Sequence, residues 1–127
     1  MENTVDLDAL TGKEVTHAYA LHDLETGWLQ QVVFQVEDMY LFVAVDTDDD
    51  EIILSLLPEL NFTALEQQFS RTQISNQRKK ISWMWRMTNQ RGYEDGFQLE
   101  FDDMEGTTVQ LVAEAAQLKL YIFQRYR

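Results

Sequence analysis

The sequence predicts a mainly β protein of the α+β class, in which two four-stranded antiparallel meanders form a sandwich, roll or barrel. Three observations support this prediction. Apolar and polar residues alternate over most of the chain, which is the period of a strand. The alternating runs are short and are bounded by turn residues. Residues 14–57 and 80–123 also align with their apolar positions in step, which indicates an internal repeat within one domain over residues 1–127.

The first half of the chain predicts one helical turn followed by a meander. Residues 6–10 favour the turn, which Gly12 would end. Pro58 closes the meander, because proline has no amide hydrogen to donate to a sheet. The expected strands cover residues 14–22, 29–37, 40–45 and 52–57.

The linker over residues 58–79 predicts a short helix and then a loop. Thr63 and Glu66 have the spacing of a capping box, so we expect the helix at about residues 63–70. Residues 70–79 are polar and are expected to form a loop. The second meander then follows, with strands over residues 81–88, 97–102, 107–113 and 118–126.

The alternation also sorts the side chains into two faces. We expect the shared core to contain Val15, Tyr19, Val32, Phe34, Val36, Leu41, Val43, Trp83, Trp85, Phe97, Leu99, Phe101, Leu111, Leu120 and Ile122. The opposite face carries Val33, Phe42, Ile53, Met84, Tyr121 and Phe123. So many large apolar residues need a cover, which either the linker helix or a second chain would supply. The second case predicts a homodimer.

Charge and composition narrow the class of partner. The net charge is −12, and residues 1–60 contain fourteen acids and one base, whereas residues 61–127 contain eight acids and nine bases. Nucleic-acid binding needs clustered Lys and Arg, so we expect no nucleic acid as a partner. The first twenty residues lack the basic start and apolar run of a signal peptide. With no Cys and no long apolar run, the sequence predicts a cytoplasmic protein with no membrane contact.

The acidic run over residues 46–51 is the first candidate site. Asp46, Asp48 and Asp50 have the spacing of the first ligands in an EF-hand loop, but the match then fails at Glu51 and Leu57. A divalent site of another kind, a solvated turn and a docking site for a basic partner all remain open. The partner-binding candidates in this run are Asp48, Asp49, Asp50 and Glu51.

A second group of candidates is aromatic and basic. Trp28 and Tyr93 each follow a glycine at a loop end, and Arg91 lies in the polar loop over residues 89–96. Together with Arg86 and His17, these residues could line a ligand pocket. The chain contains none of the common nucleotide-binding, zinc-protease or serine-hydrolase motifs, so we predict no cofactor and no catalytic residue.

The run Leu10-Thr11-Gly12-Lys13-Glu14-Val15, the short alternating strands and the Asp48–Glu51 turn resemble small acidic bacterial proteins of uncharacterised domain families. Some similar small proteins accompany toxins as immunity partners. The resemblance implies a non-enzymatic bacterial protein and implies no site residue.

Two hypotheses of function follow. The first is a non-catalytic interaction module, for example an immunity or inhibitor protein, whose acidic turn docks a basic protein surface. The alternative is a small-ligand-binding or enzymatic β-domain with a pocket near Trp28, Tyr93 and Arg91. A structural homodimer without a ligand is the third possibility.

Overall fold

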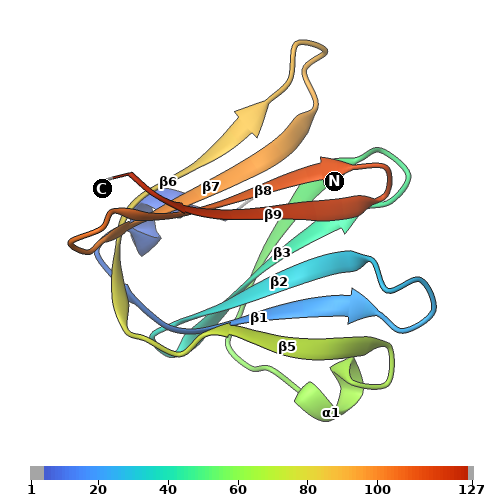
Figure 1. Ribbon diagram of the computed structural model, residues 1–127, viewed down its shortest axis with the longest axis horizontal. Helices are drawn as coiled ribbons and strands as arrows, with labels where there is room; N and C mark the ends of the chain where they lie inside the picture. Colours follow the sequence, from blue (N-terminus) through green and yellow to red (C-terminus); the bar gives the residue numbers. More distant parts are fainter. Residues whose placement is uncertain (1–4, 126–127) are drawn as a thin grey trace.

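The computed structural model describes residues 5–125, which form one open antiparallel sheet of nine strands (Figure 1). The strand order is β4-β3-β2-β1-β6-β7-β8-β9, and β5 pairs with Ala18–Asp23 of β1, on the same edge that pairs with β6 at Glu14 and Val15. The mainly β prediction is therefore confirmed, with nine strands in place of eight. The strands are β1 (Glu14–Asp23), β2 (Leu29–Val36), β3 (Met39–Asp46), β4 (Glu51–Leu57), β5 (Phe69–Ser75), β6 (Lys79–Thr88), β7 (Glu94–Asp102), β8 (Thr107–Glu114) and β9 (Gln117–Gln124). The predicted turn before β1 is a 3-10 helix, η1 (Leu7–Leu10).

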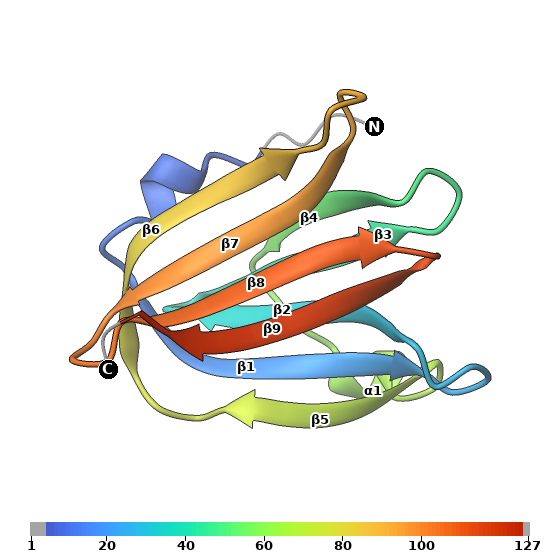
Figure 2. The same ribbon diagram turned by 45° about the horizontal axis from the view of Figure 1, so that its top comes forward.

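The sheet bends so that its two halves lie over one another as two layers (Figure 2). β1 to β5 form the first layer and β6 to β9 form the second. The layers join at a corner, where Glu14 pairs with Lys80 and Val15 pairs with Lys79. β4 then contacts β7 and β8, and β2 contacts β9. The space between the layers is the hydrophobic core.

Most of the predicted core is confirmed. The inner faces of both layers bury Val15, Val32, Phe34, Val36, Leu41, Val43, Phe97, Leu99, Phe101 and Leu111. Leu120 is half-buried against this cluster. These residues alternate along their strands, as expected for a sheet with one face against a core.

The prediction for Trp83 and Trp85 is wrong, because β6 contains a bulge. The pairing with β7 shifts register between Ile81 and Trp83, so Met84 pairs with inward-facing Leu99 and joins the core. A one-residue shift moves every following side chain to the other face. Trp83 is therefore 58% exposed on the outer face, and Trp85 is half-buried beside it.

Two further core predictions need correction. β1 shifts register between Val15 and His17, so Tyr19 lies on the outer face and is only half-buried. Ile122 does face inward, but β9 is the last strand of its layer, so this side chain is half-exposed at the layer edge. The bulges of β1 and β6 fall at positions that the proposed repeat aligns. The duplication itself stays a prediction.

The linker differs from the prediction in two ways. The short helix α1 (Phe62–Leu65) is capped by Asn61 in place of Thr63, because the Asn61 side chain accepts a hydrogen bond from the Ala64 amide at 3.1 Å. Part of the predicted loop is strand β5, which pairs with β1. Its polar side chains hide the strand period, and they suit an edge strand because they discourage pairing with other chains.

The linker covers part of the outer face of the first layer. The rings of Phe62 and Tyr19 meet edge to face at 5.1 Å, and Arg71 lies 3.8 Å over the Phe62 ring. On the same outer side, Leu21 and Val33 are fully buried. The outer face of the second layer, in contrast, exposes Trp83, Tyr121 and Phe123. Within residues 5–125, neither helix is long and apolar enough to cross a membrane.

Candidate functional site

The turns that carry the predicted partner residues lie at one end of the molecule. Figure 1 shows the β1–β2, β3–β4, β6–β7 and β8–β9 turns together at the end away from the corner. We call this end the acidic end, because its turns and adjoining strand ends carry Asp23, Glu25, Asp46, Asp48, Asp49, Asp50, Glu51, Glu94, Asp95 and Glu114.

Side chains of the acidic turn tie the two layers together at this end. Asp50 Oδ1 accepts a hydrogen bond from the Ala116 amide at 2.7 Å, and Glu51 Oε2 accepts one from the Glu94 amide at 3.1 Å. The Gln30 amide side chain donates to the Ala116 carbonyl at 2.9 Å. Asp50 and Glu51 therefore stabilise the fold, whatever else they contact.

Asp48 and Asp49 occupy the exposed tip of the β3–β4 turn. Asp46 Oδ1 accepts hydrogen bonds from their amides, at 3.0 Å from Asp48 and 3.4 Å from Asp49. The Asp46 carboxylate thus fixes the backbone at the start of the turn. Asp50, at the end of the turn, has a positive φ of 53°. Within the described part of the chain, no group of three or more His, Asp or Glu side chains could hold a metal ion, so Asp46, Asp48 and Asp50 do not converge on one.

The structure does not gather the residues of the alternative pocket. Trp28 is exposed in the β1–β2 turn of the first layer. Arg91 and Tyr93 are exposed in the β6–β7 turn of the second layer, which is a separate part of the acidic end (Figure 1). His17 pairs with Gln35 near the opposite end of β1.

A cavity that the sequence reasoning missed lies where the two layers fail to close. Among the described strands, β5 pairs only with β1 and β9 only with β8, which leaves a seam between β5 and β9. A cavity of about 300 Å³, the seam cavity, opens there. Phe34, Phe101 and Val109 lie among its apolar lining. Ser75, Asn76, Gln77, Lys79 and Thr107 supply its polar lining.

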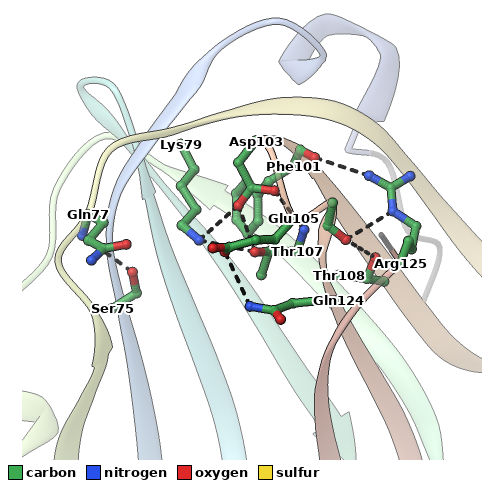
Figure 3. A network of polar contacts seen from close by, with 11 residues as sticks. Ser75, Gln77, Lys79, Phe101, Asp103, Glu105, Thr107, Thr108, Gln124 and Arg125 are labelled. Carbon is green, nitrogen blue, oxygen red and sulfur yellow. Dashed lines mark hydrogen bonds and ion pairs between the residues drawn. The ribbon is translucent and has the colours of Figure 1, made fainter. Parts of the chain in front are cut away.

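Figure 3 shows the polar network beside this cavity. Lys79 Nζ donates to Asp103 Oδ2 at 3.0 Å and to Thr107 Oγ1 at 3.1 Å. The Thr107 amide donates to Asp103 Oδ1 at 2.8 Å, and its hydroxyl donates to Asp103 Oδ2 at 2.6 Å. Burial raises the pKa of Asp103, but the hydrogen bonds from Thr107 and Lys79 outweigh burial and hold that pKa well below its usual range.

The sequence contains little that could reveal this network. Lys79 belongs to the basic triplet over residues 78–80, which indicates a charged surface and no particular partner. Asp103 lies 24 residues further along, in the β7–β8 turn. The two meet because β6 pairs with β7, and Lys80 lies opposite Asp102 in that register.

Comparison with known proteins identifies a family and no specific activity. No curated protein and no solved structure matches the chain. One family model covers residues 1–127, and its description is "Family of unknown function (DUF6334)". This match confirms the predicted resemblance to a domain of uncharacterised function. The chain therefore belongs to the DUF6334 family.

Proposed function

We propose that this protein is a non-catalytic interaction module whose acidic end docks a basic surface of a protein partner in the bacterial cytoplasm. An immunity or inhibitor protein would be one form of such a module. The observation that supports the proposal is the β3–β4 turn, which presents Asp48 and Asp49 to solvent on a backbone fixed by Asp46, Asp50 and Glu51.

A fixed turn suits recognition because little conformational entropy is lost when a partner binds. Asp50 and Glu51 fix the turn to the second layer, and Asp46 fixes the backbone of the tip. The two exposed carboxylates can then face a basic surface without reordering of the chain.

The neighbouring β1–β2 turn adds negative charge to the same end. Asp23 Oδ2 accepts hydrogen bonds from the amide and the hydroxyl of Thr26, both at 2.9 Å, and these bonds lower the pKa of Asp23. Such a field accelerates encounter with a cationic partner and weakens as salt is added.

The test is a pull-down from a host lysate at low and high salt, with the tagged protein as bait. Asp48→Asn with Asp49→Asn removes two charges from the tip and retains similar shape. Asp38→Asn with Asp102→Asn is the matched control, because both residues are exposed and lie outside the turns of the acidic end. We expect a salt-sensitive partner whose capture falls severalfold with the tip variant only. Equal capture by all three proteins, or no salt-sensitive partner, would contradict the proposal.

We also propose that the protein forms a homodimer through the outer face of the second layer. Trp83, Tyr121 and Phe123 are exposed there at 58%, 50% and 45%, and the linker covers only the first layer. Trp83 lies on β6, whereas Tyr121 and Phe123 lie on β9, so they flank the outer faces of β7 and β8. Large apolar residues exposed on one face of a sheet are typical of interaction surfaces. Sedimentation of the parent protein at tens of micromolar should give a mass of two chains. The double variant Trp83→Ser with Tyr121→Ser should sediment with a lower mass. A mass equal to one chain would refute self-association.

A further inference from the structure

We propose that the seam cavity binds a small neutral amphiphile, a molecule with an apolar tail and one hydroxyl or carbonyl group. This site is separate from the acidic end and does not depend on the function proposed above. Its features are an apolar lining, a half-exposed isoleucine and a lysine whose charge is already balanced.

The apolar part of the cavity is continuous with the core. Phe34, Phe101 and Val109 line it and are themselves at least nine-tenths buried. Ile122 comes from β9 and is half-exposed, although its strand period directs it inward. An apolar tail in the cavity would remove the surface of Ile122 from water, which favours occupancy.

The polar part of the cavity determines the class of head group. An ammonium has three N–H donors, and Lys79 uses two of them on Asp103 and Thr107. One donor is left for a ligand. Asn76 and Gln77 also line the cavity.

Charge balance favours a neutral head group over an ion. The carboxylate of Asp103 lies 3.0 Å from Lys79 Nζ, so the pair carries no net charge. A ligand carboxylate or ammonium would meet one like and one opposite charge in this pair, so it would gain little net attraction. Nothing would then offset the loss of its hydration on entering the cavity. A hydroxyl or carbonyl oxygen can accept the remaining hydrogen bond without this penalty.

The volume sets the size of the ligand. A cavity of about 300 Å³ is at the lower end of the range for small-molecule sites. At about 30 Å³ for each water-sized group, it holds a tail and head group of about ten non-hydrogen atoms. An unbranched alcohol of eight carbons is therefore a suitable probe.

The experiment titrates the full chain with octan-1-ol, octanoate and octylammonium and follows amide chemical shifts by NMR. We expect octan-1-ol to shift amides of β5, β8 and β9, and to bind at least tenfold more tightly than either ion. Each methylene from pentan-1-ol to octan-1-ol should raise affinity about fourfold, which corresponds to its burial. Alcohols longer than nonan-1-ol, which has ten non-hydrogen atoms, should gain nothing more.

Two substitutions on β9 test the location. Ile122→Trp enlarges a side chain in the cavity wall and should abolish binding while the protein stays folded by NMR. Tyr121→Trp is the matched control, because residue 121 is next to Ile122 on β9 but its side chain points to the opposite face. This variant should bind octan-1-ol as tightly as the parent protein does. Lys79→Met should reduce the preference for the alcohol over an alkane of equal length.

Three results would overturn the proposal: no saturable shift with any alcohol, undiminished binding by Ile122→Trp, or tighter binding of octanoate than of octan-1-ol. None of them bears on the acidic end, because Asp48 and Asp49 are not part of the seam cavity.

Discussion

Replacement of Asp103 by Asn tests how strongly the network of Figure 3 holds the β7–β8 turn to β6. The carboxylate accepts three hydrogen bonds, two from Thr107 and one from Lys79, and its side chain is only 20% exposed. Hydrogen bonds to charged groups contribute about 1.5–3 kcal/mol each. Asn keeps one acceptor oxygen, but it removes the charge that balances Lys79, so we expect a net loss of about 2–3 kcal/mol.

The assay is urea unfolding at pH 7, with the exposed neighbour Asp102→Asn as control. The control should change the free energy of unfolding by less than about 0.5 kcal/mol. If Asp103→Asn costs no more than this control, the network does not stabilise the turn as argued.

The same variant makes a prediction about pH. Because the pKa of Asp103 is lowered in the folded protein, its stabilisation is fully present above the unfolded carboxyl pKa of about 3.9. It is lost as the pH falls from there towards the lowered folded value. Unfolding curves of Asp103→Asn should therefore change less with pH in this window than those of the parent. An identical slope for both proteins would refute the assignment.

Four further substitutions test the local geometry. Ala116→Gly should stabilise the protein by about 1 kcal/mol in thermal unfolding, because residue 116 has a positive φ of 63°; a destabilised variant would contradict this. Gly96→Ala should destabilise it by about 1–3 kcal/mol, since the new methyl group would lie 2.9 Å from Met87 Cβ; unchanged stability in urea would show that β6 yields easily. Trp83→Ser should cost less than about 1 kcal/mol and Leu99→Ala about 2–5 kcal/mol, and the reverse order would restore the original face assignment.

The sequence was sufficient for the strands and most of the core, because alternation survives wherever one face of a regular strand is buried. It failed at Trp83, Trp85 and Tyr19 for one reason. A bulge inserts a residue without changing the local composition. The sequence pattern therefore gives no sign of it, although the side chains after the bulge lie on the opposite face. β5 was missed for another reason, since its polar side chains give no apolar period.

The acidic tip could be predicted and the seam cavity could not. A run of four carboxylates within five residues, Asp46 to Asp50, stands out in any composition scan. The cavity depends on which strands do not pair, and Lys79 and Asp103 are ordinary charged residues until β6 and β7 bring them together. The structural role of Asp50 and Glu51 could not be predicted from the sequence either. Their hydrogen-bond partners, the amides of Ala116 and Glu94, lie in the second half of the chain.

The hydrogen bonds from the acidic turn to the second layer have a consequence for exchange with deuterated water. The amides of Glu94 and Ala116 lie at a strand start and in a turn, where exchange is normally fast. Each is held by a carboxylate from far away in the chain, so both should exchange slowly. These two signals would report the separation of the layers before the strands themselves unfold.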